Sequence, residues 1–139
     1  MGLIFVDIEL VNAGDTYMVQ RQALGSEAVR RLTVKALVDT GAYKLTISER
    51  VRHELGLFTI EKEIATLADG SKIEVDIAGP VEVRFQNRRT TVDAIVIPGD
   101  EQTLLGAIPL EGMDVVIDPK AQTMTINPEN PNIAGTILK

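Results

Sequence analysis

The sequence contains no cysteine and no tryptophan, and it has a single histidine, His53. The lack of cysteine excludes disulfides, zinc thiolates, iron–sulfur clusters and a thiol nucleophile. One imidazole excludes a histidine-rich metal site within the chain, and any Ser-His-Asp triad would have to use His53. Carboxylates are therefore the main catalytic groups that remain, and we expect no metal ion and no cofactor.

Basic and aromatic residues are both scarce. There are 14 lysines and arginines against 20 acidic residues, and the net charge of -6 has the wrong sign for following a phosphate backbone. Three phenylalanines and two tyrosines offer little surface for stacking on bases. The arginine pairs at residues 30–31 and 88–89 are predicted to be solvated rather than part of a basic patch. We therefore expect no nucleic-acid partner.

Long apolar runs are also missing from the sequence. No stretch approaches the ~18 apolar residues of a membrane span. The first basic residue is Arg21, so the charged start of a signal peptide is missing. We expect no membrane partner and a cytoplasmic protein. The 139 residues, of which 45% are hydrophobic and 24% charged, fit one folded domain over residues 1–139 with an aliphatic core.

The hydrophobic pattern predicts many short strands. Residues 3–11 alternate, with Ile4, Val6 and Ile8 on one face, which is the period of a half-buried strand. Further strands are predicted at residues 16–23, 28–38, 59–67, 72–77, 81–85, 89–97, 114–117, 122–126 and 133–138. Strands at this spacing, with turn signals between them, indicate a small all-β protein that is closed or orthogonally packed.

The same hydrophobic pattern predicts few helices. Residues 49–55 form the one clear helical segment, which Ser48 can cap and Gly56 can end. Residues 107–113 are compatible with a further helical turn. The predicted fold class is therefore mainly β with one or two short helices.

Two glycine-containing turns interrupt the strands in the middle of the chain. The first joins the strands at residues 59–67 and 72–77 and consists of Ala68, Asp69, Gly70 and Ser71. Asp-Gly between strand-like runs predicts a tight hairpin, because a type I′ turn needs positive φ. The second, Gly79 and Pro80, predicts the end of one strand and the start of the next.

One acidic residue, Asp39, directly follows an apolar strand at residues 36–38. Its carboxylate would emerge at the end of a buried strand, which is costly unless the group is used or paired. The Thr40 hydroxyl can lock the loop, and Gly41 lets backbone N–H groups approach the carboxylate closely. Asp-Thr-Gly alone is also typical of a simple turn that closes a strand, so the tripeptide by itself does not decide the function.

Three motifs in order resemble the retropepsin-like aspartic proteases, which are single-domain relatives of retroviral proteases. They are the run Leu37-Val38-Asp39-Thr40-Gly41-Ala42, the hairpin at Asp69-Gly70 and the segment Leu104-Leu105-Gly106. The resemblance covers a core of residues 32–126 and implies a small closed β-barrel of the acid protease type. Residues 127–132 would then be a linker, and residues 133–139 an interface strand at the C-terminus.

The same resemblance assigns roles to individual residues. It implies that Asp39 is catalytic, with its loop supported by Thr40, Gly41 and Ala42. It implies a flap over the substrate formed by Ala68, Asp69, Gly70 and Ser71, and a segment behind the active loop formed by Leu104, Leu105 and Gly106. The sequence departs from the family pattern at Tyr43 and Lys44, both of which would lie near the substrate cleft.

A single Asp-Thr-Gly in the chain has a structural consequence. Aspartic peptidase chemistry needs two carboxylates that share one proton and activate a water between them. The second carboxylate must come from a two-fold partner, so we expect a homodimer in which two copies of Asp39 face each other. The expected function is an aspartic endopeptidase that cleaves a peptide or protein substrate beneath two flaps.

Other interpretations of the sequence remain open. One is a non-catalytic dimer of the same fold that binds a peptide or protein, and another is a monomeric acidic β-barrel that mediates interactions. A carboxylate pair of the glycosidase type among Asp15, Asp100 and Asp118 is a further alternative. His53 is expected to point to solvent and to pair with Glu49, four residues earlier.

Overall fold

A computed structural model describes residues 3–99 and 102–138. The strands of the main sheet are β1 (Phe5–Asn12), β2 (Arg31–Val38), β3 (Leu45–Ser48), β4 (Phe58–Thr66), β5 (Lys72–Phe85), β6 (Arg88–Ile97) and β7 (Thr103–Leu105). A separate hairpin is formed by β8 (Val115–Asp118) and β9 (Thr123–Ile126). The helices are α1 (Ala13–Gln20), α2 (Glu49–Leu55) and α3 (Ala107–Met113), with one 3₁₀ turn at Ser26–Ala28.

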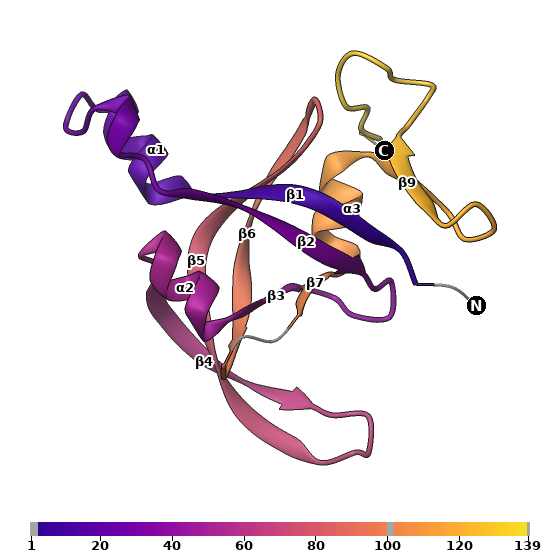
Figure 1. The fold of residues 1–139 in the computed structure, drawn as a ribbon, viewed down its shortest axis with the longest axis horizontal. Coiled ribbons are helices and arrows are strands. Elements are labelled where there is room, and N and C mark those ends of the chain that lie inside the picture. The colour runs from indigo at the N-terminus through magenta and orange to yellow at the C-terminus, as the bar shows by residue number, and fades with distance from the viewer. Residues whose placement is uncertain (1–2, 100–101, 139) are drawn as a thin grey trace.

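The main sheet closes on itself as a barrel (Figure 1). Its strand order is β1-β2-β7-β3-β6-β5-β4, and β1 also pairs with β5, so that six strands form a ring and β4 extends beyond it. In Figure 1 the β4–β5 hairpin projects below the barrel, and the loop that follows β2 lies above the tip of this hairpin. The small closed barrel expected from the sequence is confirmed.

The core is aliphatic and follows the predicted alternation. Ile8 and Leu10 of β1 are fully buried, and Leu10 pairs with Leu32 in the antiparallel ladder between β1 and β2. The other fully buried large apolar side chains are Leu45, Ile47, Leu55, Ile77, Leu105, Met113, Val11, Val81 and Val83. Removing these side chains from water is the main source of stability for a domain without disulfides.

Helix α2 has the predicted ends. The Ser48 hydroxyl accepts a hydrogen bond from Val51 N at 3.1 Å, and Gly56 ends the helix with φ at 64°. His53 points to solvent, as expected. The expected pairing of Glu49 with His53 is wrong, because the Glu49 carboxylate takes hydrogen bonds from Arg52 instead.

Helix α1 replaces the strand predicted at residues 16–23, so that strand prediction is wrong, while the mainly β fold with a few short helices is confirmed. The Asn12 side chain accepts a hydrogen bond from Asp15 N at 3.0 Å and caps the helix. The Asp15 carboxylate, in turn, accepts two hydrogen bonds of 2.9 Å from the Arg30 guanidinium. These contacts override the strand propensity of the local sequence.

Gly79 and Pro80 do not end a strand, contrary to the sequence prediction. Strand β5 runs through them, and its register against β6 shifts between Ala78 and Val81. Proline cannot donate a hydrogen bond to the ladder, and a bulge is a place where that missing N–H is tolerated. The result is one long, bent strand that serves both the barrel and the projecting hairpin.

The C-terminal segment forms no strand in this chain, so the strand predicted at residues 133–138 is not present. The linker at residues 127–132 also does not hold the tail away from the barrel. Asn87 Nδ2 donates to Pro131 O at 2.8 Å, and Asn130 Nδ2 donates to the Asp114 carboxylate at 3.0 Å. The first hydrogen bond satisfies a backbone carbonyl of a segment that has no ladder partner, and the second ties a side chain of the segment to Asp114.

Arg88 is buried, and the prediction that it is solvated is wrong. Its side chain is 0% exposed, and it donates hydrogen bonds to the carbonyl oxygens of Asn130 and Asp114. The neighbouring Arg89 is exposed but pairs with Glu82 at 2.6 Å. Neighbouring residues of a strand point to opposite faces, which is why one arginine of the pair enters the interior.

Candidate active site

The Asp39 carboxylate lies at the end of β2, in the loop that leads to β3. Asp39 N donates to Leu105 O at 3.0 Å, and Gly41 N donates to the Asp39 carboxylate at 3.0 Å. Ala42 N donates to Asp39 O at 3.1 Å and closes the turn. Asp39 is partly buried, whereas the Thr40 side chain is exposed and has no hydrogen-bond partner among the described residues. Backbone groups therefore fix the carboxylate.

The segment at residues 104–106 lies directly behind this loop. A Cβ on Gly106 would sit 2.5 Å from Lys44 O and 2.8 Å from Ala42 O, so no larger residue fits without a backbone shift. The next residue, Ala107, donates its N–H to Ala42 O at 2.8 Å. The structure thus brings together the two motifs that the sequence separates by more than sixty residues.

The β4–β5 hairpin ends in the predicted turn, with a different geometry from the predicted one. Leu67 N donates to Ser71 O at 2.8 Å, and Gly70 N donates to Leu67 O at 2.9 Å. Gly70 has φ at 87°, but Asp69 does not have positive φ, so the type I′ prediction is wrong. A three-residue loop with glycine in the left-handed region closes the hairpin instead. Ala68, Asp69, Gly70 and Ser71 are all exposed.

An ion pair joins the active loop to this hairpin. Lys44 Nζ lies 2.7 Å and 2.6 Å from the two carboxylate oxygens of Glu63 on β4. Tyr43, the other departure from the family pattern, is 78% exposed. Sequence reasoning singled out Lys44 but missed Glu63, because no local signal separates it from the nearby Glu61.

The other acidic residues that the sequence offered have structural partners. The hydrogen bonds from the Arg30 side chain hold the pKa of Asp15 below its usual value. Asp118 accepts hydrogen bonds from the backbone N–H groups of Lys120 and Ala121 at the turn between β8 and β9. Asp100 lies outside the described residues. A glycosidase-type pair is therefore not supported, since Asp15 is occupied by its arginine.

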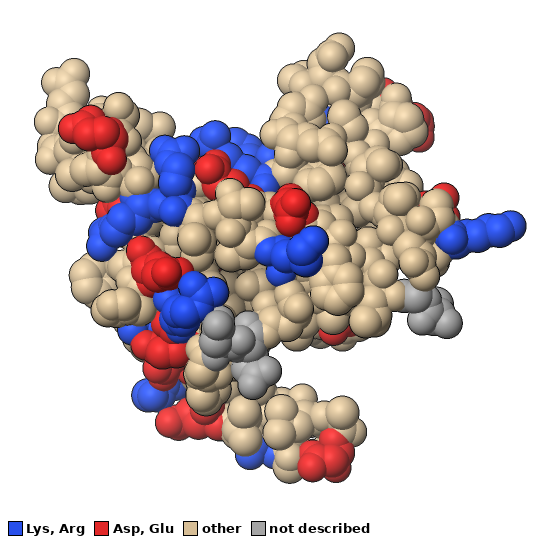
Figure 2. All heavy atoms as spheres, viewed as in Figure 1, with Lys and Arg blue, Asp and Glu red and all other residues tan. Residues whose placement is uncertain are grey.

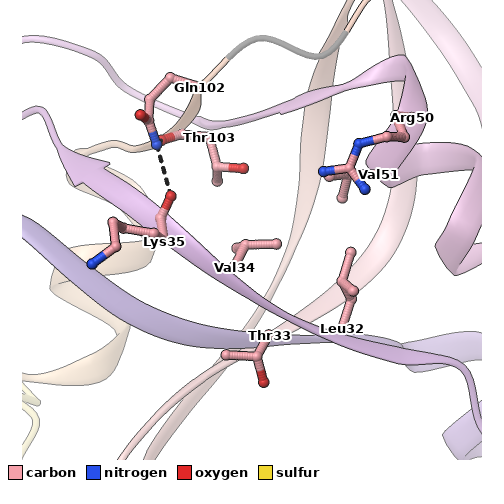
Figure 3. A pocket seen from close by; sticks show the side chains of 8 residues that line it. All are labelled: Leu32, Thr33, Val34, Lys35, Arg50, Val51, Gln102 and Thr103. Carbon is pink, nitrogen blue, oxygen red and sulfur yellow. Dashed lines mark hydrogen bonds between the residues drawn. The ribbon is translucent and has the colours of Figure 1, made fainter.

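Two grooves lie on the surface of the barrel. One, of about 460 Å³, lies between β2, α2 and the start of β7 (Figure 3). In it, Gln102 Nε2 donates to Lys35 O at 2.7 Å. The other, of about 240 Å³, is lined by Lys44 and Ile108 among others. Asp39 is not among the residues that line either groove.

The surface of the described residues carries both signs of charge. Figure 2 shows acidic and basic side chains next to each other over α2, the start of the projecting hairpin and the middle of β1 and β2, and a mostly uncharged area toward the right of the view. Within residues 3–99 and 102–138, no cluster of three or more His, Asp or Glu side chains is placed to hold a metal ion. No helix in the described part of the chain is long and apolar enough to cross a membrane.

The closed barrel with its Asp-Thr-Gly loop is that of a retropepsin-like aspartic protease domain. The family model described as aspartyl protease matches residues 27–108, more than half of the chain, so the chain belongs to this family. The match includes Asp39, the hairpin tip at Gly70 and the segment at residues 104–106. The first strand and the C-terminal tail lie outside it.

Two solved structures of low sequence identity resemble the chain, and the first of them shares its fold. The retroviral protease-like domain of Ddi1 from Leishmania major is 18% identical, with a TM-score of 0.56, over 92% of this chain and 90% of that chain. A retropepsin-like aspartic protease from Rickettsia conorii is 17% identical, with a TM-score of 0.47, over 85% of this chain and 89% of that chain. No curated protein sequence matches the chain significantly.

Proposed function

We propose that this chain is an aspartic endopeptidase that acts as a homodimer on extended peptides. The proposal rests on how the Asp39 carboxylate is held. Its carboxylate emerges partly buried at the end of a core strand, receives one backbone hydrogen bond from Gly41, and pairs with no cation among the described residues. A carboxylate held in this way is positioned but not neutralised, as a general base must be.

The proposed chemistry uses one Asp39 from each chain. Two carboxylates about 3 Å apart cannot both ionise, so they hold one proton between them. The ionised carboxylate takes a proton from a water, whose oxygen forms a bond to the scissile carbonyl carbon. The protonated carboxyl donates its proton to the carbonyl oxygen. The C–N bond then breaks as the amine leaves with a proton, and the hairpins exclude bulk water.

The single Asp-Thr-Gly of the sequence supports the dimer. The chemistry needs two carboxylates, and a second chain would supply the second one. The tail adds apolar surface that is unpaired in the described chain, since Ile133 is 77% exposed and Ile137 is 90% exposed. We propose that residues 133–138 take part in the interface.

Light scattering at micromolar concentration tests the dimer. We expect a mass of about twice the 15.1 kDa of the chain. Truncation after residue 132 should lower this mass toward that of a monomer if the tail forms part of the interface. A monomeric protein that still hydrolyses peptides would disprove the two-chain mechanism, because the second carboxylate would have to come from the same chain.

Asp39→Asn tests the catalytic role on a mixed peptide library between acid and neutral pH. We expect cleavage to fall by at least about a thousandfold, as for removal of a group that acts only in the transition state. The dimer and the fold should persist, because asparagine is nearly isosteric. Asp7→Asn, at an exposed carboxylate of β1, is the matched control and should cleave normally. Equal cleavage by both variants would refute the catalytic role of Asp39, whereas binding of peptides without cleavage by the wild type would favour a peptide-binding dimer.

A further inference from the structure

The ion pair between Lys44 and Glu63 joins two separate parts of the fold, the Asp39 loop and the β4–β5 hairpin. Lys44 follows the loop that carries Asp39, and Glu63 lies in the middle of β4, on the projecting hairpin. The ammonium contacts both carboxylate oxygens, at 2.7 Å and 2.6 Å. Both side chains are about one-third exposed, so solvent screens the pair less than a fully exposed one.

The Lys44 end of this pair is fixed to the barrel. The Lys44 carbonyl lies against Gly106, at 2.5 Å from where a Cβ would be. The preceding carbonyl, of Tyr43, accepts a hydrogen bond of 2.8 Å from Ile108 N at the start of α3. The lysine side chain therefore extends from backbone that is held on both sides.

The Glu63 end lies on the inward face of the hairpin. Glu63 is directly opposite Val75 in the ladder between β4 and β5, and opposite residues of an antiparallel pair share a face. Val75 is only 6% exposed, so this face is the one that packs toward the barrel. The next pair, Lys62 with Asp76 at 2.7 Å, is on the other face, and no hydrogen bond or ion pair of the described residues joins it to the Asp39 loop.

We propose that Lys44 and Glu63 form a tether that holds the β4–β5 hairpin against the Asp39 loop and sets how often the hairpin opens. They are positioning residues, because neither is required to touch the reacting atoms. The effect of the tether on catalysis rests on the proposed peptidase function. Its effect on the position of the hairpin does not rest on that function and can be measured in the absence of substrate.

Spin labels can measure the position of the hairpin directly, because the chain has no cysteine of its own. Ser71→Cys places one label at the exposed tip, and Gln20→Cys places the other at the exposed end of α1. Labelled chains are mixed with an excess of unlabelled chains, so that each distance arises within one chain. The distance distribution then reports the ratio of open to closed hairpins.

Glu63→Gln removes the charge with little change in shape, and Asp76→Asn is the matched control on the same hairpin. We expect the ratio of open to closed hairpins to rise about threefold to fivefold with Glu63→Gln, the change that a partly screened ion pair produces. It should stay at the wild-type value with Asp76→Asn. An unchanged distribution with Glu63→Gln, or an equal change with both variants, would overturn the tether.

Exchange of the two charges provides the rescue. Lys44→Glu combined with Glu63→Lys should restore the wild-type distribution, whereas Lys44→Glu alone should open the hairpin further than Glu63→Gln does. Circular dichroism and unfolding of each variant identify any that has lost its fold. Failure of the double variant to restore the distribution, while folded, would also reject the tether.

Peptide cleavage separates this inference from the proposed function. If the protein is a peptidase, Glu63→Gln should raise KM about threefold to fivefold with a smaller change in kcat, because substrate is held by a hairpin that opens more often. A rise in KM equal to that of Asp76→Asn would count against the tether. If no peptide is cleaved by the wild type, the proposed function fails, and the spin-label distances alone decide the tether.

Discussion

The loop that carries Asp39 and the hairpin that would cover it are held in opposite ways. In the loop, Asp39 N donates a hydrogen bond to Leu105 O of β7. The loop carbonyls of Ala42 and Tyr43 accept hydrogen bonds from the first two N–H groups of α3. The hairpin tip around Gly70 is fully exposed and has only its own turn hydrogen bonds. The fold therefore holds the Asp39 loop through contacts with other elements, whereas the hairpin tip is held by its own turn.

Two glycines show the same difference. Gly106 has an ordinary φ of -87°, but backbone atoms lie less than 3 Å from where its Cβ would be. Gly70 has φ at 87°, and nothing lies within 4 Å of the Cβ position. The first glycine is required by close approach, and the second by backbone conformation. Substitutions at the two sites should therefore have different consequences.

Gly106→Ala should give the largest effect, because the added methyl meets the carbonyls of Lys44 and Ala42, which cannot rotate away. We expect a loss of about 2–3 kcal/mol in the free energy of unfolding, measured with denaturant, and a loss of peptide cleavage. Gly112→Ala in α3 is the control, since its methyl would first meet the Thr90 side chain, which can move. If Gly106→Ala is as stable and as active as the wild type, the loop does not require the close backbone approach at Gly106, and the proposed difference between loop and hairpin is wrong.

Acid should weaken the barrel through Glu82. Burial alone would raise the pKa of Glu82, but hydrogen bonds from Arg84 and Arg89 outweigh it and hold the pKa below its ordinary value of 4.5. A carboxyl with a lowered pKa in the folded state stabilises the fold above its unfolded pKa. That stability is lost as the pH falls through the folded pKa.

Glu82→Gln should therefore cost about 2 kcal/mol at pH 7, the scale of hydrogen bonds to a charged group. The difference from wild type should shrink as the pH falls below the ordinary value of 4.5. Glu61→Gln, on the exposed hairpin, should change the unfolding free energy little at any pH. Denaturant unfolding between pH 7 and pH 3 measures both, and a constant difference for Glu82→Gln would contradict the assigned pKa direction.

The parts of the fold that local signals specify could be predicted from the sequence. Ser48 and Gly56 mark the ends of α2, because caps act within one helical turn. The Asp-Gly turn marks the β4–β5 hairpin, although the type of turn depends on the strands that it joins. Asp39 was recognisable because an acidic residue directly after a buried strand is unusual unless it has a partner or a function.

The parts that depend on distant residues could not be predicted. Helix α1 depends on the contact between Asp15 and Arg30, and the segment looks like a strand without it. The burial of Arg88 depends on carbonyls supplied by Asn130, forty-two residues later. Glu63 belongs to the site only because the barrel places it beside Lys44. Sequence patterns report local periodicity, and each of these contacts joins separate elements.

Gly70→Val should have the smallest effect on stability and a clear effect on turnover. A β-branched residue at positive φ strains the tip by roughly 1–2 kcal/mol, but the strain falls on an exposed turn that can open locally. We therefore expect the unfolding free energy of the barrel to change by less than about 1 kcal/mol. On the flap interpretation, kcat/KM should fall by about tenfold, because the hairpin must close over the substrate.

Gly99→Val is the matched control for this last substitution. Gly99 has φ at 78° and nothing within 4 Å of its Cβ position, so the added strain is alike, but the residue lies outside the hairpin. Steady-state cleavage should separate the two variants, with turnover reduced at position 70 and retained at position 99. Equal rates for Gly70→Val and wild type would mean that the tip is an ordinary turn. Equal losses for both variants would mean that strain, and not closure of the hairpin, lowers the rate.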